Sequence, residues 1–383
     1  MAAVGCSTLD CFPENVLIDI LSYLNVRELV RSSRVCRRWK QLVKDQRLWR
    51  AVDLSTWKGV TSRVLWVLLR QYLGHGLRCL RLRGLLLSVR RGAFLTESWL
   101  QALRSKCPRL RRLCLQHTDL RNLRSCCLLP PSLQVLELSF CEVPSGFFAH
   151  DAETEGKAAI ETLVLYKVPS FSDQHLRSLS TWRQLSRLEL RDLSRVSAGG
   201  LKSCIPPGAQ TLGRLKHLAL ETWSLAQMVA LGLGTGWPGL ERLRLGGNEV
   251  SPGLLTVSRL QDLRWLRLHK CRLNQKMVLK CCRSLSRLRV LEFSEVEFVE
   301  DEEETDGQKS SEDDPVPNLR LSLRSLLPEC SVCFSGWQIR KRLRVSAPAG
   351  GEVSALPLVP EFSEETVAVV TRTCASEAEH VVC

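Results

Sequence analysis

One six-residue pattern of apolar and polar positions recurs nine times along the 383-residue chain. It has the form L-x-x-L-x-L and begins at Leu77, Leu110, Leu133, Ile160, Leu185, Leu215, Leu240, Leu263 and Leu288. Its fourth and sixth positions alternate with other residues, which is the period of a β-strand with one buried face. Between copies, apolar residues take helical spacing, as in Trp99, Leu100 and Leu103. The pattern therefore predicts one strand and one helix in each unit.

The copies start 23 to 33 residues apart, close to the period of leucine-rich repeats. In such repeats the strands stack edge to edge, so that each row of leucines buries the next. Cys141, Asn248 and Cys271 stand three residues after the last apolar position, where the repeat favours Asn or Cys. We predict an α/β fold in which a curved parallel sheet carries its helices outside, preceded by three short helices.

The segment before the repeats, residues 9–50, has helical apolar spacing. Leu17, Ile20, Leu21 and Leu24 follow the i, i+3, i+4, i+7 rule, and Pro13 precedes them at a helix start. Three short helices make a poor core on their own. The segment is therefore either a helical cap for the solenoid or a module that keeps an apolar face for a partner.

The words FPENVLIDILSYL, RVCRRWKQL and LWR in this segment resemble the signature of an F-box. An F-box followed by leucine-rich repeats resembles the F-box/leucine-rich-repeat family of SCF (Skp–cullin–F-box) ubiquitin ligases. The resemblance implies a non-catalytic substrate-recognition subunit, which docks on the Skp adaptor and through it on a cullin and a RING subunit. The adaptor-binding positions that it implies are Phe12, Pro13, Leu17, Ile20, Leu21, Leu24, Val35, Cys36 and Trp39.

Composition and spacing also predict how the chain is divided. We expect a leader at 1–8, the F-box at 9–50, a helical linker or cap at 51–76, the repeats at 77–298, an acidic disordered insert at 299–318, a degenerate last repeat or cap at 319–338 and a disordered tail at 339–383.

Charge changes this picture in one respect. The net charge is +14, although Glu295 to Asp314 alone hold eleven acidic residues and one lysine. Outward positions of the predicted strands, on the concave face, are rich in arginine. Because arginine forks suit carboxylates and phosphates, this face is either a site for an acidic or phosphorylated degron or an idle solvated surface. The predicted substrate-binding residues are Arg187, Arg191, Arg242, Arg244, Trp265, Arg267 and His269.

Other functions find less support in the sequence. We find no catalytic, cofactor-binding or metal-binding motif, no signal peptide and no stretch that suits a membrane. The 17 scattered cysteines suit reduced thiols in the cytoplasm or nucleus. The alternative function is a stand-alone solenoid with a helical cap that binds protein or RNA. Nucleic acid is not the expected partner, because few aromatic residues line the predicted face.

Overall fold

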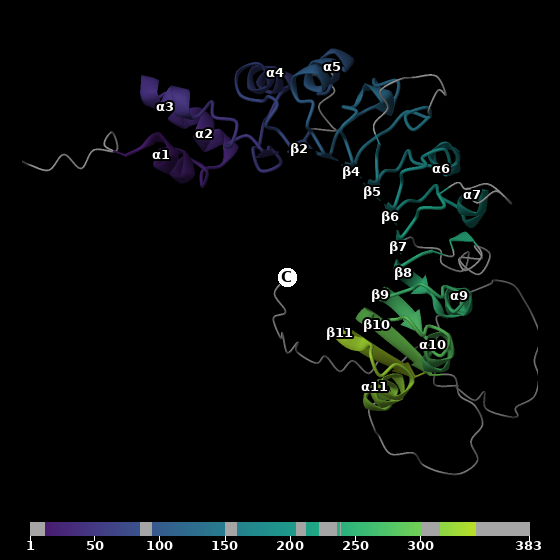
Figure 1. The fold of residues 1–383 in the computed structure, drawn as a ribbon. Coiled ribbons are helices and arrows are strands. Elements are labelled where there is room, and N and C mark those ends of the chain that lie inside the picture. The colour runs from purple at the N-terminus through teal and green to yellow at the C-terminus, as the bar shows by residue number, and fades with distance from the viewer. Residues whose placement is uncertain are drawn as a thin grey trace, which may run out of the picture. The chain divides into compact units, whose positions relative to one another are not determined.

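The computed structural model describes residues 12–84, 94–149, 159–203, 212–221, 236–237, 239–300 and 315–341. The chain forms two compact units, Met1–Thr222 and Trp223–Cys383, which are treated separately below. In each unit the strands run side by side, and helices lie on one side of them (Figure 1). The predicted fold class is confirmed.

Three short helices open the first unit: α1 (Glu14–Leu21), α2 (Val26–Ser32) and α3 (Arg37–Leu42). Asn25 and Glu28 form a capping box at α2, in which the side chain of each accepts the backbone N–H of the other. The buried faces of α1 and α2 contribute Leu17, Leu21 and Leu29 to the core. These contacts tie the helices together despite their length.

Seven parallel strands follow in chain order, each paired residue by residue with the next. They are β1 (Ala51–Asp53), β2 (Cys79–Arg83), β3 (Arg112–Gln116), β4 (Val135–Ser139), β5 (Thr162–Tyr166), β6 (Arg187–Arg191) and β7 (His217–Glu221). The connecting helices are α4 (Ser62–Gln71), α5 (Glu97–Lys106), the 3-10 helix η2 (Cys126–Leu128), α6 (Asp173–Leu179) and α7 (Ala198–Ser203).

The first strand lies where the sequence predicted only a helical linker or cap. Residues 51–76 contain β1 and α4, and β1 pairs with β2, so this segment already belongs to the sheet. Trp49, Val52 and Leu54 fill the three apolar positions of the repeat and are at most 1% exposed. The pattern was missed because tryptophan and valine replace leucine at the first two of these positions.

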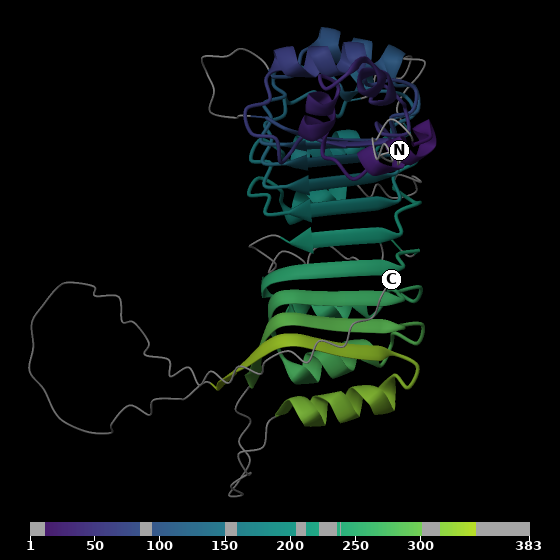
Figure 2. The ribbon, with the colours of Figure 1, turned by 90° about the vertical axis from the view of Figure 1, so that its left-hand side faces the viewer.

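The second unit has four parallel strands in chain order: β8 (Arg242–Glu249), β9 (Trp265–Leu273), β10 (Val290–Glu300) and β11 (Ser331–Lys341). Its helices are α9 (Ser251–Val257), α10 (Gln275–Cys282) and α11 (Pro315–Leu326). Figure 2 shows these strands side by side.

Two predicted boundaries shift in this unit. Of the two alternatives for residues 319–338, a degenerate last repeat or a cap, the structure shows a repeat that extends beyond both bounds: α11 leads into β11, which pairs with β10. Of the acidic insert expected at 299–318, both ends belong to β10 and α11. Residues 301–314 lie outside the described residues, as do the predicted leader at 1–8 and the part of the predicted tail from 342 onward.

Two cysteines show why the repeat favours Asn or Cys three residues after its last apolar position. The Cys141 thiol donates to the carbonyls of Leu115 (3.4 Å) and Ser139 (3.3 Å), and Cys271 makes the equivalent bonds to Leu245 and His269. Both cysteines are buried. At these two positions the thiol therefore satisfies backbone carbonyl groups of its own strand and of the preceding strand.

Candidate interaction surfaces

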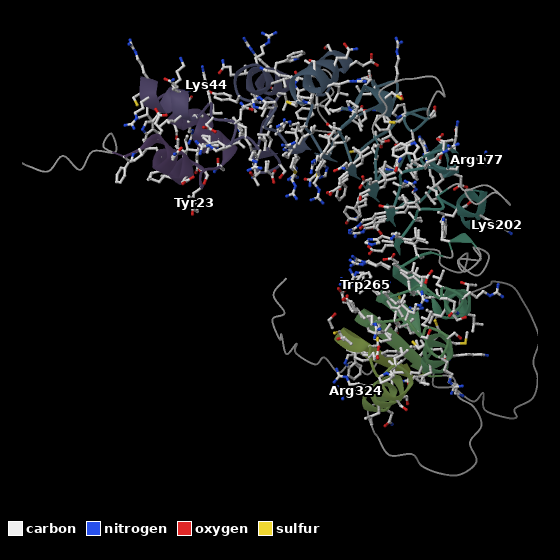
Figure 3. The ribbon with its side chains drawn as sticks, in the orientation of Figure 1. Tyr23, Lys44, Arg177, Lys202, Trp265 and Arg324 are labelled. Carbon is white, nitrogen blue, oxygen red and sulfur yellow. The ribbon has the colours of Figure 1, made fainter. Side chains whose placement is uncertain are left out.

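Helix α1 has apolar side chains on two sides. Leu17, Ile18 and Leu21 point into the core. Val16, Ile20 and Tyr23 follow one another at i, i+4 and i+7, and Tyr23, at 90% exposure, is almost fully solvated. Phe12 precedes them at the same spacing with 47% exposure. Figure 3 shows Tyr23 projecting from the helices at the N-terminal end of the chain. We call Phe12, Val16, Ile20, Tyr23 and Val35 the exposed apolar stripe.

The predicted adaptor-binding residues divide between exposed or partly exposed positions, three of which belong to this stripe, and the core. Phe12, Pro13, Ile20, Val35 and Cys36 are exposed, and Leu24 and Trp39 are partly exposed. Leu17 and Leu21 are only 3% and 2% exposed. These two leucines hold the helices together and are not part of the exposed surface. The adaptor contact of these two leucines stays a prediction, and the other seven residues of the predicted set are at least partly exposed.

The second candidate surface consists of the side chains that the strands point away from the helices, here called the strand face. In the first unit, Glu189 on β6 has a side chain only 6% exposed, and the guanidinium groups of Arg187 and Arg191 both bond to it. Such a carboxylate is costly to bury unless cations pair with it. Arg187 and Arg191, predicted to bind substrate, are thus already engaged inside the chain.

The same holds on the strands that precede β6. Arg112 pairs with Glu137 on the next strand at 2.8 Å, and Arg81 reaches Asp53 on β1 at 3.5 Å. The Cys114 thiol donates to the other oxygen of Glu137 at 3.3 Å. Burial and the nearby Glu137 carboxylate raise the pKa of Cys114 to about 12. Carboxylates on neighbouring strands therefore neutralise much of the arginine charge.

In the second unit, Glu292 on β10 organises the strand face. It accepts the Trp265 indole N–H at 3.1 Å, and its other oxygen lies 3.7 Å from the Arg267 guanidinium. Trp265 lies on the strand side of its unit (Figure 3). Arg242, its register neighbour on β8, is exposed. The other two predicted residues, Arg244 and His269, are partly exposed on the same face.

Other kinds of site are not seen in the part of the chain that the structure describes. Its cysteines are free thiols, and its His, Cys, Asp and Glu side chains form no group that could hold a metal ion. None of the described helices is long and apolar enough to cross a bilayer.

Known proteins resemble this chain in its N-terminal helical region and over most of its length. A family model described as F-box-like matches residues 9–55. F-box/LRR-repeat protein 12 of Homo sapiens is 36% identical over 294 residues, which are 75% of this chain and 88% of the relative. The chain belongs to the F-box/LRR-repeat family. The proteins of the same name from Bos taurus and Mus musculus are each 34% identical over the same shares.

A solved structure of an internalin from Listeria monocytogenes covers 66% of this chain and 87% of its own at 13% identity. Its TM-score of 0.31 is too low to support any conclusion about function.

Sequence reasoning missed two members of the exposed apolar stripe of this F-box/LRR-repeat chain, Val16 and Tyr23. A signal was present, because the segment from Val16 to Leu24 is apolar on more than one side of the helix. A short helix with two apolar sides buries one in its own core and needs a partner for the other. The predicted set treated the apolar residues of this helix as one stripe, and so combined the buried Leu17 and Leu21 with the exposed Ile20.

Proposed function

We propose that this chain is the substrate-recognition subunit of an SCF ubiquitin ligase. Family membership supports this role, because the F-box match covers the three-helix region in which the exposed apolar stripe lies. In this role the stripe binds the Skp adaptor, which connects the chain to a cullin and a RING subunit. The chain contributes proximity. It holds a substrate lysine near an activated ubiquitin, so that their bimolecular reaction becomes effectively unimolecular.

The observation that carries the proposal is the exposed apolar stripe. Burying one large apolar side chain contributes about 1.5–3 kcal/mol. Monomeric proteins seldom leave such side chains grouped in solvent, and groups of this kind mark binding sites. Ile20 and Val35 are 47% and 67% exposed on separate segments of the three-helix region. A partner that covers both segments is the simplest account of the exposure.

The substrate is proposed to bind the strand face. In the second unit, Glu292 fixes the Trp265 indole and Arg242 stands exposed beside it. A fixed aromatic ring loses little conformational freedom on binding, which suits a contact that dominates affinity. Arg242, together with Arg244, Arg267 and His269, would supply positive charge for an acidic or phosphorylated degron. Arg187 and Arg191 could take part only by exchanging their bonds to Glu189.

The adaptor contact is tested by co-expressing the full chain with the Skp adaptor and measuring their affinity by calorimetry. Ile20→Asp and Tyr23→Asp place a charge in the stripe at residues that are 47% and 90% exposed. We expect each to weaken binding by about tenfold to a hundredfold, the effect of losing 1.4–2.8 kcal/mol. Val67→Asp is the matched control, because Val67 is 44% exposed on α4, outside the three helices.

If the wild-type chain binds the adaptor and both stripe variants bind it with the same affinity, the adaptor contact lies outside the stripe. Failure of the folded wild-type chain to bind the adaptor would sink the proposal. The helices would then be a cap, and a stand-alone binding solenoid would take its place.

The substrate contact needs a separate measurement. Arg242→Glu, Arg244→Glu and Arg267→Glu together should abolish capture of candidate substrates by the assembled ligase and leave adaptor binding unchanged. Unchanged capture by this triple variant would remove the charged strand face of the second unit from recognition.

A further inference from the structure

A row of arginines lies at the edge of the sheet in the first unit, where its strands begin. The residue immediately before each of β1, β2 and β3 is an arginine: Arg50, Arg78 and Arg111. The Arg50 carbonyl accepts the Arg78 N–H at 2.8 Å, and the Arg78 carbonyl accepts the Arg111 N–H at 2.8 Å. The three residues are therefore direct neighbours at strand spacing, about 4.8 Å from one to the next. The starts of the strands lie along one edge of the sheet (Figure 2).

A fourth arginine, Arg109, joins this row from the turn after α5. It follows Pro108 and precedes Leu110, which anchors the turn in the core. Desolvation and the charges of Arg109, Arg111 and Arg50 lower the pKa of Arg78, so the Arg78 guanidinium lies within electrostatic range of the other three. We call Arg50, Arg78, Arg109 and Arg111 the rim arginines.

The rim arginines lack the carboxylates that accompany arginines of the strand face. Asp53, Glu137 and Glu189 each hold strand-face arginines in this unit. Within the described ranges, by contrast, none of the four rim arginines forms an ion pair. Arg50, Arg109 and Arg111 are exposed and Arg78 is partly exposed, so a ligand can reach them.

The row is also short. At the equivalent position before β4 stands Gln134, and before β5 stands Glu161. The Gln134 amide donates to the Glu161 carboxylate at 3.4 Å. Positive charge therefore spans three strands, about 10 Å at ordinary strand spacing, and then gives way to an acidic residue.

We propose that the rim arginines bind a phosphorylated serine or threonine in a segment of a partner protein. A phosphate monoester carries close to two negative charges and three acceptor oxygens, so it can engage several guanidinium groups at once. A single carboxylate would neutralise one of the four. Planar arginine forks match phosphate better than the point charge of lysine. That this partner is a ubiquitin-ligase substrate rests on the function proposed above.

Nucleic acid suits this site less well. Sequence-independent binding to nucleic acid uses a long cationic track with aromatic side chains on which bases stack. Here the cationic row covers about 10 Å, and no aromatic residue stands among its members. One phosphate with its flanking peptide fits the dimensions of the row.

The test uses the full chain and a fluorescein-labelled ten-residue peptide of glycine, serine and alanine with one central phosphoserine. Anisotropy should show saturable binding that weakens with salt. The Arg78→Gln and Arg111→Gln double variant should lose at least about tenfold in affinity, as charge-assisted hydrogen bonds predict. The matched control is Arg264→Gln, an exposed arginine at the same position before β9, and it should bind like the wild type.

Four results would overturn the proposal: equal binding of the unphosphorylated peptide, undiminished binding by the double variant, equal loss in the control, or tighter binding of a labelled twelve-nucleotide single-stranded RNA through the same arginines. The double variant lies outside the exposed apolar stripe and should retain full affinity for the Skp adaptor. Failure of the phosphopeptide measurement therefore leaves the ligase role standing. If the chain fails to bind the adaptor but binds the phosphopeptide normally, the ligase role is refuted and the phosphate site at the rim arginines stands.

Discussion

The strand face and the rim of the first unit contain the same residue type in opposite circumstances. On the strand face, Arg187 and Arg191 enclose the Glu189 carboxylate and are part of how the sheet is held together. At the rim, Arg78 lies near three other arginines, and neither Arg78 nor Arg111 forms an ion pair in the described residues. An abundance of arginine therefore does not identify a binding site. The position of the carboxylates on neighbouring strands decides whether an arginine serves the fold or is available to a partner.

Cysteines also divide into buried and exposed residues, and the expected difference in their rates of alkylation is the largest of the predicted effects. Cys114 is buried on the strand face with a pKa of about 12, whereas Cys36 is exposed beside Val35 of the apolar stripe. Thiolate is the reactive form, so at pH 8 Cys114 should react with iodoacetamide roughly a thousandfold more slowly than an ordinary thiol. Pulse labelling followed by peptide mass spectrometry measures both rates. Adding the Skp adaptor should protect Cys36 and leave Cys114 unchanged; similar rates for the two thiols would contradict the division.

Removing both cations from Glu189 should have the next largest effect. The Arg187→Ala and Arg191→Ala double variant leaves a buried carboxylate without its partners, a change that typically costs 3 kcal/mol or more. Urea unfolding should show a marked fall in midpoint. Arg177→Ala is the control, because Arg177 is exposed on α6, away from the strands (Figure 3). A loss no greater than in the control would show that the strand-face arginines are as available as those of the rim.

A buried histidine adds a pH dependence of intermediate size. His175 Nδ1 accepts the Ser172 N–H at 3.1 Å, and Nε2 donates to the Pro144 carbonyl at 3.0 Å, which requires the neutral ring. Burial lowers the pKa of His175. Because its folded pKa lies below the unfolded value near 6.5, its contribution to stability is complete above that value and is lost as the pH falls below it.

Thermal unfolding between pH 7 and 5 measures this loss. His175→Gln should be less stable at pH 7 and should show a smaller decline toward pH 5. An identical decline in both proteins would assign the pH dependence to other groups.

The smallest effect is expected at the rim, and its sign is the informative part. Replacing Arg78 and Arg111 by glutamine removes repulsion and breaks no ion pair in the described residues. The melting temperature should stay the same or rise by about one or two degrees, since exposed charges contribute little. A fall of several degrees would place the rim arginines with those of the strand face.

Much of the fold follows from the sequence because the leucine pattern reports burial directly. The first and last strands were harder to recognise. Val52 and Val332 stand where the other strands have leucine. These two segments form strands because each pairs with an adjacent strand, β2 or β10. Missing β1 had a consequence for the surface, because Asp53, the partner of Arg81, lies on it.

The surfaces were less predictable than the fold. Outward-facing arginines can be found by counting positions, but Arg112 meets Glu137 only because β3 and β4 are adjacent and in register. On α1, periodicity alone did not show which apolar side faces the core. The folded structure, in which α1 packs against α3, shows that Leu21 is buried and that Ile20 is exposed.

The residue-by-residue pairing of the strands also bears on how such a surface can change in evolution. Repeat lengths vary from 23 to 33 residues, yet each strand from β2 to β7 aligns with the next without a shift. Insertions accumulate in the connections and leave neighbouring columns of side chains aligned. Substitutions can therefore change the outward-facing side chains of one strand at a time, while the spacing between neighbouring strands stays the same. Specificity and architecture are, in this protein, separately mutable.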